Sequence, residues 1–153
     1  ARSKVALLRL AADLRRIRDE APPGISAAPV SEDNMFIWTA SIVGPDETPW
    51  EGGVFSLRLT FPKEYPEKPP HVKFTCPIFH PNIYADGSLC LDLLQDLWSP
   101  VISVDMLLTS IASLLPDPNC ASPANPEAAR LMETDPKKYK RTVRRFAQRT
   151  VEE

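Results

Sequence analysis

The stretch FIWTASIVGPDETPWEGGVFSLRLTF, residues 36–61, determines the expected architecture because apolar and polar residues alternate twice along it. The apolar members are Phe36, Trp38, Ala40 and Ile42 in the first run, and Phe55, Leu57, Leu59 and Phe61 in the second. This period of two is typical of strands that bury one face. The short connection through residues 44–53, rich in glycine and proline, favours an antiparallel meander over parallel crossovers.

An amphipathic helix is expected before the strands. Its apolar positions recur at helical spacing, whereas Arg9, Asp13 and Arg16 fall elsewhere around the helical wheel. The residues expected to face the core are Leu7, Leu10, Leu14 and Ile17. The Pro22-Pro23-Gly24 run ends this helix.

Further helices are expected after the strands. Val72 and Phe74 make a shorter alternating run, and Ser103 is predicted to cap a largely buried helix that ends at Leu115. Asn125-Pro126 and Asp135-Pro136 each place a capping side chain before a proline at the first helical position. The order of helix, strands and helices predicts the α+β class.

The composition fits one globular domain spanning residues 1–153, with 43% hydrophobic and 25% charged residues. The formal net charge of −2 gives no overall attraction to nucleic acid or to an anionic membrane. Neither partner is therefore expected, and any such contact would have to be local. The chain start lacks the unbroken apolar run of a signal peptide, so a soluble protein is expected.

Cys90 is the candidate nucleophile. It lies in a long segment without clear periodicity, IFHPNIYADGSLCLDLLQDLWSPVI, residues 78–102, and a connection of that length is typical of a functional loop. Asp86, Gly87 and Asp92 give it a polar setting that Cys76 and Cys120 lack. Three cysteines match neither a disulfide framework nor a CxxC metal motif, so reduced, intracellular thiols are expected.

His80 and Asn82 are the other polar residues of interest in this segment. His80 as a base would make the chain a cysteine hydrolase, but the following proline restricts His80 and favours a structural turn. The Asn82 carboxamide can donate either to a developing oxyanion or to a nearby backbone carbonyl. Both uses of Asn82 stay open at this point.

These residues resemble the ubiquitin-conjugating enzymes, the E2 family. The resemblance rests on His80-Pro81-Asn82, on Gly87-Ser88-Leu89-Cys90-Leu91-Asp92 and on Trp98-Ser99-Pro100. The runs at 65–70 and 117–119 fall in the family's order and spacing. Within the family, the sequence is most similar to the branch used in post-replication repair and histone mono-ubiquitination, from which Leu97 and Cys120 depart.

The resemblance implies a four-stranded antiparallel sheet and a transferase mechanism. Cys90 would accept ubiquitin as a thioester from the activating enzyme, which consumes the ATP, and would pass it to a substrate lysine without a cofactor of its own. Asn82 would be the oxyanion donor or loop organiser, and Asp92 would orient the lysine. Ser122 stands at an acidic gate position of other members, where phosphorylation would supply charge. Inactive relatives lack the cysteine, so Cys90 argues against a silent binding module.

The resemblance also implies partner surfaces. Arg2, Lys4 and Arg9 match the basic face that meets the activating enzyme. Ligase RING domains would dock on Glu67 with Lys68 and on Ser99 with Pro100. The charge of Glu67 replaces a phenylalanine typical of members that serve HECT ligases, so a RING ligase is favoured. A cytoplasmic and nuclear location is expected.

Overall fold

The alternating stretch forms the two central strands of a four-stranded antiparallel sheet. The computed structural model describes residues 2–121 and 123–152. Strands β1 (Ile25–Ser31), β2 (Asn34–Val43), β3 (Val54–Thr60) and β4 (His71–Phe74) follow one another in sheet order β1-β2-β3-β4. Trp38 pairs with Leu59 and Ile42 pairs with Phe55, so one apolar face is continuous across β2 and β3. The predicted meander is confirmed.

Strand β1 shows no clear alternation of apolar and polar residues. Only Ile25 is buried, and the residues after it are half-buried or exposed in turn. It lies at the sheet edge, where Pro29 is tolerated.

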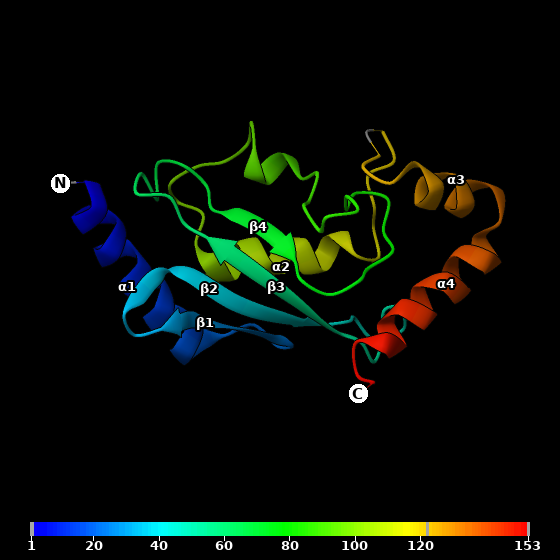
Figure 1. Cartoon of the computed structure of the whole chain (residues 1–153), viewed down its shortest axis with the longest axis horizontal. Coiled ribbons are helices and arrows are strands. Elements are labelled where there is room, and N and C mark those ends of the chain that lie inside the picture. The colour runs from blue at the N-terminus through cyan, green and yellow to red at the C-terminus, as the bar shows by residue number, and fades with distance from the viewer. Residues whose placement is uncertain (1, 122, 153) are drawn as a thin grey trace.

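The described part of the chain has five helical segments: α1 (Arg2–Glu20), η1 (Asp92–Leu94), α2 (Val104–Leu114), α3 (Pro126–Thr134) and α4 (Pro136–Arg149). Figure 1 shows α2 crossing one face of the sheet, the start of α1 at one end of the molecule and α3 with α4 at the other. No helix in the described part of the chain combines the length and apolar character needed to cross a membrane.

The predicted face of α1 is wrong at two positions. Leu7 is 42% exposed, whereas Asp13 is buried on the same side as Ala6, Leu10 and Ile17. The carboxylate tolerates burial because the Tyr65 hydroxyl donates to it at 2.5 Å and Arg9 lies 3.4 Å away.

Two of the three predicted capping side chains are confirmed. The side chains of Asn125 and Asp135 accept hydrogen bonds from backbone N–H groups at the starts of α3 and α4, at 3.1 and 3.2 Å. Ser103 precedes α2 as predicted, but its hydroxyl donates to the Asp105 carboxylate and makes no capping bond. The predicted cap at Ser103 is therefore wrong in its contact, although α2 begins where expected.

His80 fixes the segment that follows β4 against the end of α2. Its side chain is 0% exposed, and Nε2 lies 2.8 Å from the carbonyl oxygen of Leu114. Nδ1 accepts the backbone N–H of Asn82 at 2.9 Å, so the proton is on Nε2 and is donated to Leu114. Burial lowers the pKa of His80 from 6.5 to about 4.

The buried histidine predicts a pH-dependent stability. Between about pH 6.5 and pH 4 the unfolded chain binds a proton at His80 that the folded chain does not, so the free energy of unfolding should fall as the pH is lowered through this range. The expected loss is on the order of 3 kcal/mol. Urea unfolding at several pH values measures it.

The matched control for this measurement is His80→Gln, which has no group that titrates in this range. Its unfolding free energy should depend less on pH than that of the wild type, whatever its absolute stability. Parallel pH curves for the two proteins would contradict the assignment of a buried, neutral His80.

Candidate active site

Cys90 ends a tight backbone turn that begins at Asn82. The N–H of Cys90 donates to the carbonyl oxygen of Asn82 at 2.8 Å, and the N–H of Tyr84 donates to the carbonyl oxygen of Ser88 at 2.8 Å. These bonds close a short antiparallel turn, within which Ile83 and Leu89 form a bridge. Cys90 is half-buried and directly precedes the segment that leads to η1. The candidate nucleophile Cys90 is therefore held by its backbone opposite Asn82.

The tip of this turn is fixed by Asp86 and Gly87. The Asp86 carboxylate accepts two hydrogen bonds from Ser88, one from the backbone N–H at 2.9 Å and one from the side-chain hydroxyl at 3.1 Å. These bonds lower the pKa of Asp86. Gly87 has a φ of +95°, and a Cβ there would lie 2.1 Å from the carbonyl oxygen of Phe74. Both residues, expected to provide a polar setting for Cys90, thus serve to shape the turn and attach it to β4.

Asn82 connects this turn to the loop that contains Asn119. Asn82 is only 1% exposed, and its side-chain Nδ2 donates to the carbonyl oxygen of Asn119 at 2.6 Å. In return, the N–H of Asn119 donates to Oδ1 at 2.7 Å. The carbonyl oxygen of Pro81 also accepts the N–H groups of Ala124 and Asn125, at 2.8 and 2.9 Å. The backbone partner considered for Asn82 is therefore present.

Asn119 has a role in the site that was not predicted from the sequence. It entered only as part of the 117–119 run, although its backbone pairs with Asn82 and its side chain accepts the N–H of Ala121 at 3.1 Å. The asparagine itself could have indicated a turn here, because asparagine side chains commonly hydrogen-bond to the backbone two residues later in the chain.

The remaining predicted catalytic residues have different settings. Asp92 is exposed and begins η1, and its carbonyl oxygen accepts the N–H groups of Gln95 and Leu97 at 2.9 and 3.0 Å. Ser122 lies outside the described residues. Of the other two thiols, Cys120 is exposed, and burial raises the pKa of the half-buried Cys76.

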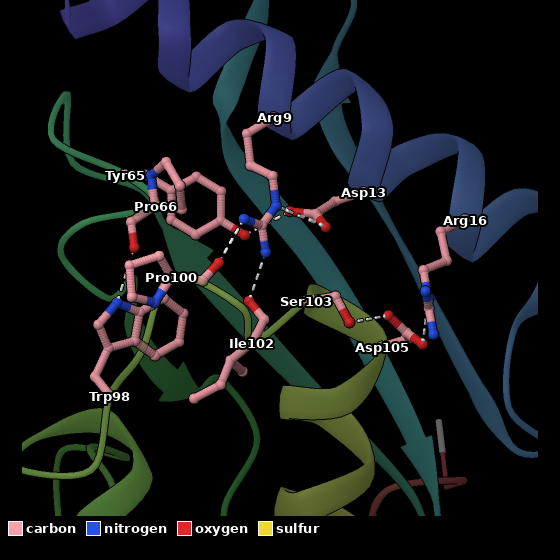
Figure 2. A network of polar contacts seen from close by, with 10 residues as sticks. All are labelled: Arg9, Asp13, Arg16, Tyr65, Pro66, Trp98, Pro100, Ile102, Ser103 and Asp105. Atoms are coloured by element: carbon pink, nitrogen blue, oxygen red, sulfur yellow. Dashed lines mark hydrogen bonds and ion pairs between the residues drawn. The ribbon is translucent and has the colours of Figure 1, made fainter.

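Two surface loops, residues 65–68 and 98–100, lie side by side and are called the docking loops below. The indole Nε1 of Trp98 donates to the carbonyl oxygen of Pro66 at 3.0 Å, as Figure 2 shows. Glu67 and Lys68 are exposed, and Ser99 is half-buried. The residues predicted to meet a ligase on two separate loops are therefore brought together.

Arg9 does not belong to an exposed basic face, and this corrects the prediction. Its guanidinium points from α1 toward the docking loops and donates to the carbonyl oxygens of Pro100 at 2.5 Å and Ile102 at 2.9 Å (Figure 2). Lys4 is exposed as expected, and the Arg2 side chain lies outside the described part of the structure. Arg9 is instead a cross-link between α1 and the second docking loop.

A carboxylate completes this cross-link. Asp13 bonds to both Arg9 and the hydroxyl of Tyr65, which begins the first docking loop. Burial raises the pKa of Asp13, although the hydrogen bonds from Tyr65 and Arg9 oppose that shift. A second pair, Arg16 with Asp105 at 2.9 Å, holds α1 to α2 (Figure 2). Helix α1 therefore sets the position of both docking loops.

Comparison with known proteins identifies the family. The sequence model described as ubiquitin-conjugating enzyme matches residues 9–147. Ubiquitin-conjugating enzyme E2 2 of Saccharomyces cerevisiae is 49% identical over 151 residues, which cover 99% of this chain and 87% of the relative. Ubiquitin-conjugating enzyme E2 3 of Arabidopsis thaliana is 54% identical over 135 residues, which cover 88% and 89% of the two chains. Ubiquitin-conjugating enzyme E2 1 of Caenorhabditis elegans is 49% identical over 142 residues, 93% and 73% of the two chains.

The matched region contains the whole sheet, the turn with Cys90 and the Asn82–Asn119 contact. The N-terminal helix, four-stranded antiparallel sheet and C-terminal helices fit the fold that the resemblance implied. The chain belongs to the ubiquitin-conjugating enzyme family and is an E2 transferase.

Proposed function

We propose that Cys90 carries ubiquitin as a thioester and releases it to a substrate lysine with the help of a RING ligase. The observation that carries this proposal is the turn from Asn82 to Cys90, which holds a half-buried thiol without a histidine base. In charging, the Cys90 sulfur attacks the thioester carbonyl on the activating enzyme, whose thiol leaves. In discharge, a lysine nitrogen attacks the same carbonyl, loses a proton and displaces the Cys90 thiolate.

The state of His80 argues against a cysteine hydrolase. Both ring nitrogens are engaged within the protein, and the lowered pKa keeps the ring neutral above about pH 4. Taking a proton from a thiol or a water would break the contact with Asn82. A thioester is already activated, so transfer to an amine depends on positioning and charge stabilisation more than on a dedicated base.

Asn82 combines two tasks in this proposal. Its amide nitrogen has two hydrogens, and the carbonyl oxygen of Asn119 takes one of them. The second hydrogen remains available to a carbonyl oxygen that becomes negatively charged when the lysine attacks. The loop contact thus orients the donor, and Asn82 is both organiser and oxyanion donor.

Asp92 is proposed to guide the incoming lysine. It is exposed two residues after Cys90, and a carboxylate at this place attracts an ammonium group and can hydrogen-bond to it. A phosphorylated Ser122 would add negative charge near the same path, and this remains a prediction.

The partner surfaces are proposed to lie at the α1 end of the molecule. The docking loops offer exposed Glu67 and Lys68. A RING ligase is favoured over a HECT ligase because Glu67 stands where members that serve HECT ligases have a phenylalanine. The activating enzyme would contact Lys4 and the exposed side of α1. The assignment to the post-replication repair and histone branch, and a location in cytoplasm and nucleus, remain predictions.

The carrier role predicts a defined ubiquitin adduct. Incubation with activating enzyme, ATP and ubiquitin should give a single adduct on a gel run without thiol, and added thiol should remove it. Cys90→Ala should give none, while Cys90→Ser should form a thiol-resistant oxyester more slowly, because a hydroxyl is a weaker nucleophile. Cys76→Ala and Cys120→Ala are matched controls and should charge like the wild type. A thiol-sensitive adduct on Cys90→Ala would refute the assignment.

The proposed role of Asn82 predicts a selective defect. Asn82→Ala should still become charged, but single-turnover discharge to free lysine should slow on the order of 10²-fold, the effect of losing one oxyanion donor. The matched control is Asn125→Ala, which removes a cap from α3 in the neighbouring loop and leaves Asn82 intact. Unchanged discharge in Asn82→Ala, or an equal defect in the control, would exclude an oxyanion role.

A further inference from the structure

Helix α4 concentrates the positive charge of the chain. It contains seven basic residues and no acidic residue: Lys137, Lys138, Lys140, Arg141, Arg144, Arg145 and Arg149. Removing these seven from the 18 cations of the chain leaves 11 against 20 acidic residues, so the remainder carries a formal charge of −9. The net charge of −2 therefore conceals a strongly basic helix on an acidic domain.

The basic residues occupy most of the outward side of α4, where Gln148 is also exposed. Its inward side buries Tyr139, Val143 and Ala147 in the core. The hydroxyl of Thr150, which caps the end of the helix, accepts the N–H of Val54 at 2.8 Å and holds that end to β3. The helix cannot rotate about its axis without exposing these apolar groups, so the orientation of its basic side is fixed.

No anion within the described residues neutralises this side. The ion pairs of the described structure are Arg9–Asp13 within α1 and Arg16–Asp105 between α1 and α2, and neither involves α4. All seven cations of α4 are exposed, and several repeat four residues apart, as in Arg141, Arg145 and Arg149. Like charges at this spacing destabilise a helix. A polyanion bound along the helix would relieve this repulsion.

A groove beside α4 continues the basic surface. It lies between α3 and α4, has a volume of about 360 Å³, and is lined by Arg130, Lys138 and Arg145, with Glu127 as the acidic residue among its lining. Together with the outward side of α4, this groove forms what we call the basic face. At a rise of about 1.5 Å per residue, Lys137 and Arg149 are roughly 18 Å apart along the helix.

We propose that the basic face binds the phosphate backbone of double-stranded nucleic acid, independently of base sequence. Duplex DNA carries about one negative charge per 1.7 Å of its axis, and contacts to it need only cations and hydrogen-bond donors. This occupant matches a fixed helix that presents cations over about 18 Å, none of them in an ion pair with another described residue.

Other polyanionic partners fit less well. A protein interface has an apolar or aromatic centre, whereas the outward side of α4 offers Gln148 and cations. Single strands bind by stacking on exposed aromatics, but Tyr139 is buried and Phe146 is half-buried beneath Arg149. A helix that lies on a membrane inserts its apolar side, which α4 uses in the core.

The basic face lies far from the docking loops, so the two surfaces can be occupied at the same time. In Figure 1, α4 lies at the opposite end of the long axis from the start of α1. Nucleic acid on α4 would leave the docking loops and Lys4 accessible. The enzyme could thus be held on a duplex while its α1 end exchanges partners, and the proposal stands independently of how Cys90 works.

The test measures the affinity of the full chain for a fluorescein-labelled DNA duplex of about 20 base pairs by fluorescence anisotropy, from about 50 to 200 mM salt. The double variant R141Q/R145Q should bind at least about tenfold more weakly at low salt and should reduce the salt slope by about 2. R15Q/R18Q removes the same charge from exposed positions of α1 and should bind within about twofold of the wild type. Thermal unfolding establishes that both variants fold.

Three results would overturn the proposal. The first is a wild type that does not bind the duplex at low salt. The second is an equal loss of affinity in both double variants, which would reflect net charge alone. The third is tighter binding to polyglutamate or to vesicles containing phosphatidylserine than to the duplex, which would assign the basic face to an acidic protein or to a membrane.

Discussion

The paired hydrogen bonds between the Asn82 side chain and the Asn119 backbone are the contact on which the active site depends. They join the turn that carries Cys90 to a loop more than thirty residues further along the chain. On the other side of Asn82, its own carbonyl oxygen holds the Cys90 N–H. One residue therefore holds Cys90 through its backbone and the facing loop through its side chain. Because Asn82 is buried, replacing it would leave backbone groups of Asn119 without partners.

The rest of the molecule supports this centre from two ends that differ in chemistry. At one end, Arg9 and Asp13 of α1 hold the docking loops through carbonyl oxygens and a tyrosine hydroxyl. At the other, α4 buries aromatic and aliphatic side chains and turns mainly cations outward. His80 links the centre to the core, and its neutrality follows from burial. The docking loops, the turn with Cys90 and the basic face thus lie at separate places on one small domain (Figure 1).

Patterns that depend on neighbours in the sequence predicted their structures well. The alternation in residues 36–61 predicted the paired strands β2 and β3. Asn125 and Asp135 cap their helices as expected. The failures involve contacts between distant segments. Asp13 is buried because Tyr65, 52 positions away, bonds to it. Arg9 turns inward because carbonyl oxygens more than ninety positions away accept its hydrogens. The formal charge of the whole chain gives no indication of the basic face, which is apparent from the residues of helix α4 alone.

If Asn82 holds the Asn119 loop in place, the removal of its side chain must free the Asn119 amide. Amide hydrogen exchange of the wild type and of Asn82→Ala, resolved by NMR, measures this. In the wild type the Asn119 and Cys90 amides should both be protected. In the variant Asn119 should lose its protection, because its acceptor is the removed side chain, whereas Cys90 should keep it, because its acceptor is backbone. An Asn119 amide that exchanges in the wild type as fast as an unstructured loop would contradict the account.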